Sequence, residues 1–200
     1  MRLFVAVTPP PEALDELEAA VAPLRSSCRD LRWTGRQNWH VTLAFLGEVD
    51  DAAVDKLAPA LTAVAAKAEA RPVSLGPAGS FPEGRPLANV LWVGLDEGAD
   101  FVRDLAKDVR EAAAGAGAPP VGKPKAYHPH LTLGRCRNPA DLRSLLRRLG
   151  GFRGRPWPAR EIQLFRSHLR PQWPEPRYED LGRWPLAAAA GVAGPAPPAA

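Results

Sequence analysis

The 200-residue sequence predicts a globular protein of mixed helix and strand, in an α+β or α/β arrangement. Two features of the chain lead to this prediction. Segments with the 3, 4, 3 apolar spacing of an amphipathic helix alternate with short β-rich runs, so each helix has a sheet face to cover. The composition, 46% hydrophobic and 24% charged residues, is that of a soluble protein with a sizeable core.

Apolar residues at helical spacing predict four helices, and residues that favour helix starts precede three of them. The expected starts are Asp50 or Asp51 for the second helix, Asp100 for the third, and Asn138 with Pro139 for the fourth. The four apolar faces consist of Leu14, Leu17, Val21 and Leu24; Val54, Leu57, Leu61 and Val64; Val102, Leu105, Val109 and Ala112; and Leu142, Leu145, Leu146 and Leu149.

Short β-rich runs between these segments predict the strands. They are LFVAV near the start, HVTLAFL from His40, VSL from Val73, ANVLWVGL from Ala88, HLTLGR from His130, EIQLF from Glu161, and RYEDLGRW near the end. The last fourteen residues, AAAAGVAGPAPPAA, contain no large side chain to bury. We therefore expect one folded domain over residues 1–186 and a disordered tail over residues 187–200.

The opening residues MRLFVAVTPP contain an apolar run that is too short for a signal-peptide core or a membrane span. This predicts a cytoplasmic protein without a membrane partner, and a monomer is the default expectation. Cys28 and Cys136 are far apart and neither belongs to a CxxC pair, so both are expected to be reduced.

A four-residue pattern, His-x-Thr-Leu, occurs once in each half of the chain. His40-Val41-Thr42-Leu43 and His130-Leu131-Thr132-Leu133 begin ninety positions apart. On a strand, His and Thr two residues apart point to one face, while the intervening residue and the following leucine point into the core. If the two strands face each other across a cleft, two imidazoles and two hydroxyls converge on one volume.

Such a pair of histidines suits acid and base catalysis without a metal or cofactor. Imidazole has an unperturbed pKa near neutrality, so one ring can act as base and the other as acid. A cyclic phosphodiester fits this arrangement: one histidine deprotonates water, the other protonates the departing ribose oxygen, and the hydroxyls of Thr42 and Thr132 hold the non-bridging oxygens. The pattern alone does not say which histidine is the acid.

Arg135 allows two interpretations. Strict alternation from His130 places it on the core side, but a bulge or strand end at Gly134 would let its guanidinium reach the cleft and pair with phosphate. Otherwise it is a solvent-facing arginine. The region from Arg135 to Arg183 contains twelve arginines and five acidic residues, which suits either a polyanion or an ordinary solvated surface.

At these residues the sequence resembles the two-histidine phosphoesterase superfamily, specifically the LigT-like RNA 2',3'-cyclic phosphodiesterases. The resemblance covers Met1 to about Leu186 and includes MRLFVAV, NWHVTLAFLGEV, GSFPEGRPLANVLWVGL, HPHLTLGR and LFRSHLRPQWPEPRYEDLGRWPL. It implies an α+β fold with two pseudo-symmetric lobes, whose antiparallel sheets line a central cleft and whose helices lie outside.

The resemblance also implies the activity: hydrolysis of RNA 2',3'-cyclic phosphate ends to 2'-phosphomonoesters, with 2',5' RNA ligation as a possible side reaction. It assigns proton donation to His40 and proton acceptance to His130. Thr42 and Thr132 correspond to positions that contact phosphate. RNA or nucleotides ending in a 2',3'-cyclic phosphate are then the partners.

Two alternatives compete with this interpretation. In the first, His128, His130 and His40 bind a metal in a metal-dependent phosphodiesterase, although no carboxylate or cysteine stands beside HPH to complete the site. Outside that alternative, His128 is expected to have a structural or entry role. In the second alternative, the arginine-rich half makes the protein a non-catalytic RNA-binding module.

Overall fold

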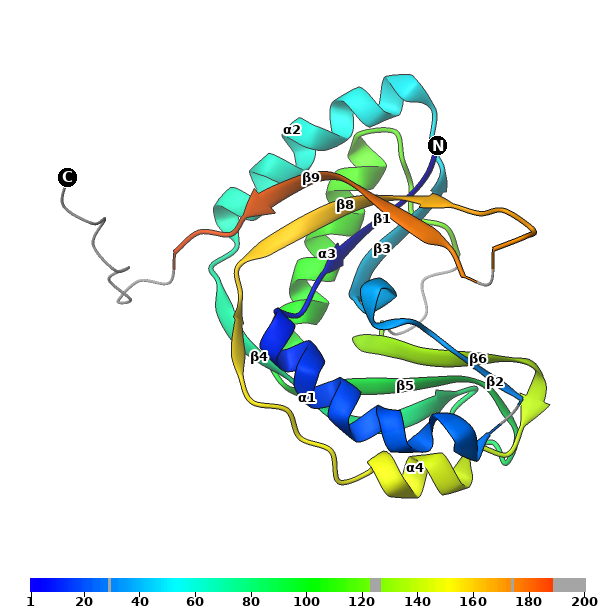
Figure 1. Ribbon diagram of the computed structural model, residues 1–200. Helices are drawn as coiled ribbons and strands as arrows, with labels where there is room; N and C mark the ends of the chain where they lie inside the picture. Colours follow the sequence, from blue (N-terminus) through cyan, green and yellow to red (C-terminus); the bar gives the residue numbers. More distant parts are fainter. Residues whose placement is uncertain (29, 123–126, 174, 189–200) are drawn as a thin grey trace, which may run out of the picture.

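The computed structural model describes residues 1–28, 30–122, 127–173 and 175–188 (Figure 1). Its described part contains four α-helices and nine strands. The strands are β1 (Arg2–Val7), β2 (Leu31–Trp33), β3 (Val41–Glu48), β4 (Arg71–Phe81), β5 (Ala88–Glu97), β6 (His130–Ala140), β7 (Trp157–Ala159), β8 (Glu161–His168) and β9 (Arg177–Pro185). The helices are α1 (Pro11–Val21), α2 (Asp51–Lys67), α3 (Ala99–Gly115) and α4 (Arg143–Leu149), with 3-10 turns at Ala22–Ser27 and Arg36–Asn38.

The strands form one antiparallel path, in the order β7-β4-β5-β6-β3-β1-β8-β9, with β2 added to β6. This confirms the α+β class. The strand pairing is shortest in the middle of this path, where β3 and β6 are joined by the single residue pair Val41 and Leu131. We call β3, β1, β8 and β9 the His40 half of the sheet, and β6, β5, β4, β7 and β2 the His130 half.

Two of the helices, α1 and α3, pack against the half of the sheet opposite to the one that they follow in sequence. Helix α1 comes directly after β1 of the His40 half, yet it packs against β4, as does α4 (Figure 1). Helix α3 comes directly after β5 of the His130 half, yet it packs against β3 and against α2, which also contacts β9. Each half of the sheet is therefore covered in part by a helix that follows a strand of the other half.

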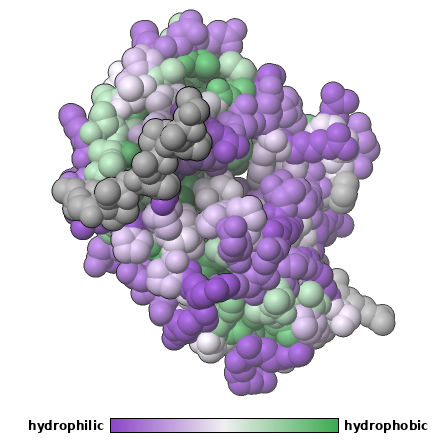
Figure 2. Space-filling model, turned by 60° about the vertical axis from the view of Figure 1, so that its left-hand side comes forward, coloured by the Kyte–Doolittle hydropathy of each residue, from purple (hydrophilic) through white to green (hydrophobic). Residues whose placement is uncertain are grey.

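Buried apolar side chains on the helices explain these positions. Leu17, Leu57 and Leu105, one from each long helix, are fully buried, as the predicted apolar faces require. On the face of the molecule drawn in Figure 2, hydrophilic residues dominate and hydrophobic ones form small patches. None of the described helices is both long enough and apolar enough to cross a membrane.

The predicted helix starts are partly right. Asp50 caps α2, because its carboxylate accepts a hydrogen bond from the backbone N–H of Ala53 at 2.8 Å. Helix α3 follows Gly98, which has a positive φ of 76°, and Asp100 lies in its first turn instead of before it. The expected start of the fourth helix at Asn138 and Pro139 is wrong.

Those two residues extend β6 because β5 offers them a partner: Ala140 pairs with Ala88. Helix α4 begins only at Arg143, after Leu142. The strands β2 and β7 were not predicted, because three residues are too few to show a period of two.

Hydrogen bonding continues one residue past the predicted domain end at residue 186. Ala187 is still hydrogen-bonded, since its N–H donates to Ala68 O at 2.9 Å and its carbonyl accepts from Ala70 N at 2.8 Å. Most of the tail predicted for residues 187–200, from residue 189 onward, lies outside the described residues.

Candidate active site

The two His-x-Thr-Leu motifs meet at the joint between the halves of the sheet. Val41 and Leu131, the residues after the two histidines, are cross-strand partners and are buried. Because side chains alternate along a strand, the histidine and threonine of each motif point to the opposite, common face. The predicted convergence of the two motifs is therefore present in the structure.

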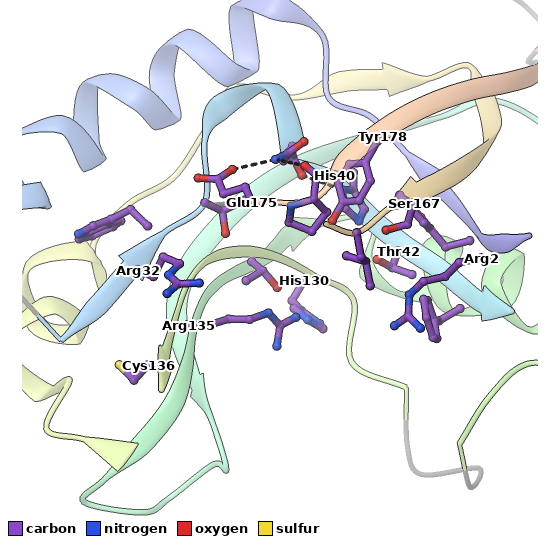
Figure 3. A pocket seen from close by; sticks show the side chains of 18 of the residues that line it. Arg2, Arg32, His40, Thr42, His130, Arg135, Cys136, Ser167, Glu175 and Tyr178 are labelled. Atoms are coloured by element: carbon purple, nitrogen blue, oxygen red, sulfur yellow. Dashed lines mark hydrogen bonds between the residues drawn. The ribbon is translucent and has the colours of Figure 1, made fainter. Parts of the chain in front are cut away.

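A pocket of about 1040 Å³ opens on that face (Figure 3). All five side chains predicted for the site line it, namely His40, Thr42, His130, Thr132 and Arg135. The other lining residues come from β1, β2 and the segments beside it, β3, β6, and the β8–β9 hairpin: Arg2, Phe4, Asp30, Arg32, Trp33, Thr34, Asn38, Phe45, Cys136, Arg137, Ser167, Leu169, Glu175, Pro176 and Tyr178.

His40 lies in an aromatic environment supplied by the His40 half. Its ring stacks on Phe4 with centroids 4.7 Å apart and meets Tyr178 edge to face at 5.4 Å. Its Nδ1 lies 2.7 Å from the carbonyl oxygen of Asn38. Because a carbonyl oxygen can only accept, Nδ1 carries the proton, and the neutral ring keeps its lone pair on Nε2.

His130 repeats this arrangement with residues of the His130 half. Its Nδ1 lies 2.7 Å from the carbonyl oxygen of His128, again two residues earlier in the chain. Its ring meets Phe81 edge to face with centroids 5.0 Å apart and lies 5.9 Å from Trp92. Both histidines are thus held as the same tautomer by the same local hydrogen bond, which leaves Nε2 as the reactive nitrogen.

Burial lowers the pKa of both histidines below the usual value. The pKa of His40 falls to about 4, chiefly through burial and further through the nearby His130 and Arg135, while its bond to Asn38 opposes the shift. The pKa of His130 is also lowered, chiefly by burial, with smaller contributions from His128 and Arg135. Both rings are therefore neutral at pH 7 before an anion binds beside them.

Arg135 reaches the pocket through a β-bulge, one of the two possibilities that the sequence allowed. Leu91 of β5 pairs with Gly134, but the next residue, Trp92, pairs with Thr132, so Leu133 is an extra residue on β6. Leu133 and Gly134 are both buried, after which the alternation resumes with Arg135 on the pocket side. Figure 3 shows its guanidinium extending toward His130.

No cluster of three or more His, Cys, Asp or Glu residues suited to a metal ion is found in the described residues. His128, proposed as a ligand in one alternative, is exposed and does not line the pocket. Its Nδ1 lies 3.6 Å from Glu83, and its carbonyl orients His130. This geometry favours the structural role over the metal-binding one.

The chain matches a known family over most of its length. The model of the 2'-5' RNA ligase superfamily matches residues 8–171. The chain belongs to this superfamily. Among curated relatives, the RNA 2',3'-cyclic phosphodiesterase of Archaeoglobus fulgidus is 30% identical over 90% of this chain and 98% of its own. That of Geobacillus stearothermophilus is 31% identical over 92% of this chain, which spans 56% of the relative's length.

Solved structures of the superfamily share the fold. TT0787 of Thermus thermophilus aligns with a TM-score of 0.74 at 28% identity, over 94% of this chain and 99% of its own. E. coli LigT in complex with 3'-AMP aligns with a TM-score of 0.71 at 26% identity, over 92% and 97% of the two chains. The chain therefore shares its fold with a protein whose structure was solved in complex with a nucleotide.

Several pocket residues of this superfamily member were not identified from the sequence. The carboxylate of Glu175, on the β8–β9 hairpin, accepts hydrogen bonds from Gly35 N at 2.9 Å and from Asn38 Nδ2 at 2.7 Å (Figure 3). Asn38 also donates to Pro176 O at 3.1 Å. The hairpin is thereby fastened to the residue whose carbonyl orients His40.

No local signal identifies Glu175 or Tyr178, because they reach the pocket only through the pairing of β9 with β8 and of β8 with β1. The closing segment LFRSHLRPQWPEPRYEDLGRWPL, which resembles the superfamily, contains both of them. Resemblance over a segment was therefore the only available indication.

Proposed function

We propose that this chain hydrolyses RNA 2',3'-cyclic phosphate ends to 2'-phosphomonoesters without a metal ion, with His40 as proton donor and His130 as proton acceptor. One observation carries the proposal: two imidazoles from opposite halves of the sheet face one pocket, each with Nδ1 bonded to a backbone carbonyl. The names of the two relatives above, both RNA 2',3'-cyclic phosphodiesterases, support the substrate class.

The reaction needs two proton transfers at one phosphorus atom. Nε2 of His130 removes a proton from water, whose oxygen forms the new bond to phosphorus. The bond from phosphorus to O3' breaks, and His40 gives its Nε2 proton to that oxygen, which leaves the phosphate on O2'. A well-placed acid or base contributes about 10²- to 10⁴-fold each.

The threonines and Arg135 stabilise the charge that develops on the non-bridging oxygens. Thr42 and Thr132 each present a hydroxyl donor beside a histidine, and the guanidinium of Arg135 can donate two parallel hydrogen bonds to phosphate. These donors belong to strands, so they are held in place before the substrate arrives.

If His40 is the acid, its ring must become protonated when the substrate binds. A ring with a pKa of about 4 is neutral at pH 7, but an adjacent phosphate anion favours the charged form and raises that pKa. A bound phosphate thus favours a protonated ring in this pocket, and the choice of His40 as donor and His130 as acceptor follows the resemblance to the LigT-like phosphodiesterases. In 2',5' ligation of RNA ends, a 5'-hydroxyl takes the place of water: its oxygen forms the new bond to phosphorus, the bond to O3' breaks, and the same two histidines transfer the protons.

The duplicated architecture belongs to the same proposal. We infer two lobes related by a pseudo-two-fold axis through the pair Val41 and Leu131, since each motif has the same Nδ1 bond on its own side of this pair. RNA as the partner, a cytoplasmic location and a monomeric state remain predictions.

A product assay tests the proposal. The purified protein is incubated with an oligoribonucleotide that ends in a 2',3'-cyclic phosphate, with and without excess chelator, and the terminal phosphate is located by NMR or by enzymatic digestion. We expect a 2'-phosphate in both conditions. A 3'-phosphate would reject the proposed leaving group, loss of turnover in chelator would favour the metal site, and binding without turnover would favour an RNA-binding module.

A further inference from the structure

Three arginines lie together on the part of the pocket formed by β2 and β6. Arg32 of β2 and Arg135 of β6 are direct cross-strand partners, so their side chains share one face. Arg137 lies two residues further along β6 on the same face. All three are exposed and line the pocket, and Figure 3 shows Arg32 and Arg135 side by side.

This arrangement is unfavourable for the free protein. Like charges directly opposite each other in an antiparallel pair destabilise the sheet. Within the described residues, we find no ion pair between any of the three guanidinium groups and a carboxylate. Asp30 also lines this side, whereas the carboxylate of Glu175 is engaged by Gly35 and Asn38. An anionic ligand would offset the repulsion.

The corresponding place in the His40 half has a different chemistry. Phe45 stands five residues after His40, as Arg135 stands five residues after His130. The ring of Phe45 is covered by the guanidinium of Arg2, at 4.7 Å from its centroid. Arg2 thus packs on an aromatic ring, whereas the cluster of three arginines extends from His130 along β6 toward Arg137.

We infer that Arg32, Arg135 and Arg137 bind the phosphodiester backbone of an RNA chain, next to the nucleotide that holds the cyclic phosphate. Arg135, the nearest of the three to His130, contacts the reacting phosphate, and Arg32 and Arg137 contact the phosphates that precede it in the chain. The inference rests on the proposed function and makes it more specific: the substrate is an oligoribonucleotide, and a free cyclic mononucleotide is a poorer one.

The test compares two substrates, a 2',3'-cyclic mononucleotide and an oligoribonucleotide with the same terminal nucleotide. The readout is the ratio of kcat/KM for the longer substrate to kcat/KM for the shorter one. In the unaltered protein this ratio is expected to exceed one. Arg32→Gln and Arg137→Gln are each expected to lower it about tenfold, mainly through KM, because each removes a contact to a charged phosphate.

Salt dependence provides a second readout. Each substitution is expected to reduce the slope of log(kcat/KM) against log salt concentration by about one for the oligoribonucleotide, since one fewer phosphate is neutralised. Arg160→Gln is the control, because this exposed arginine precedes β8 at the end opposite Ser167, which lines the pocket. It should leave the ratio and the slope unchanged.

The outcomes separate this inference from the proposed function. If the unaltered protein turns over neither substrate, the proposed function fails. If it turns over both with a ratio near one, or if Arg32→Gln and Arg137→Gln lower both activities equally, the chemistry stands and the backbone-binding role is overturned.

Discussion

The two halves of the sheet hold their histidines by the same hydrogen bond but in different surroundings. In both, Nδ1 is bonded to the carbonyl of the residue two positions earlier, at 2.7 Å. His40 is enclosed by Phe4 and Tyr178, and its pKa falls to about 4. His130 lies beside Phe81, Trp92 and the exposed His128. The repeated bond sets the tautomer, while the surroundings set how readily each ring takes a proton.

The largest effect expected from breaking this pair is on turnover. His40→Asn and His130→Asn should each lower kcat about 10²- to 10⁴-fold while the far-UV circular dichroism spectrum is unchanged, since each removes one proton transfer. The double variant should lose less than the product of the two, because the groups act as a unit. His168→Asn is the control: His168 pairs with Glu179 at 2.7 Å and does not line the pocket. Equal activity of all variants would exclude His/His catalysis.

The second effect is on stability and depends on pH. His40 titrates near pH 4 when folded and near pH 6.5 when unfolded, so between these values the unfolded chain binds more protons at this residue. The free energy of unfolding should therefore rise with pH across this window, by about 3 kcal/mol from His40 alone, and level off above it.

Denaturant titrations of the protein and of His40→Gln, at several pH values between 4 and 7, measure this contribution. The difference between the two stability curves should change across the window and be constant above it. A constant difference throughout would show that the buried His40 does not carry a lowered pKa.

A smaller effect on kcat is expected from removing the carboxylates near the two backbone carbonyls that orient the histidines, those of Asn38 and His128. Glu175→Ala removes the carboxylate that holds Gly35 and Asn38, so it should loosen the carbonyl that orients His40. We expect a fall of about tenfold in kcat with little change in KM, together with a shift of the His40 pKa in NMR titration. Glu83→Ala is the matched change, since Glu83 lies 3.6 Å from the exposed His128.

Glu83→Ala should change kcat less than twofold, because a surface ion pair contributes little. If the two variants lost activity equally, or if Glu175→Ala left the His40 titration unchanged, the carboxylate would have no positioning role.

The sequence was sufficient for the features that depend on local periodicity. The four helices, the longer strands and the common face of His40 and Thr42 all follow from spacing along the chain. The sequence was insufficient where pairing with another strand determines which way a side chain points or whether a residue belongs to a strand. Whether Arg135 faces the pocket depends on the bulge that β5 imposes at Leu133, and Asn138 belongs to a strand because β5 pairs with β6 nearby.

The pocket residues on the β8–β9 hairpin could not be predicted from the sequence for the same reason. Tyr178 contacts His40 only because β9 pairs with β8, and β8 with β1, across about 170 residues of chain. Arg32 lies on a strand of three residues, too short for a periodic signal. Such long-range pairing leaves no mark in the residues around each position.

The exchange of α1 and α3 between the halves of the sheet has a consequence for how the molecule can be divided. Although the two histidine motifs look like copies of one unit, a fragment ending after β5 would leave β3 without α3, and a fragment beginning at α3 would lack both β4 and α1. Neither copy is a self-sufficient module. The spacing between the two imidazoles consequently depends on interlocked packing on the outside of the molecule as well as on the one backbone pair that joins the strands at its centre.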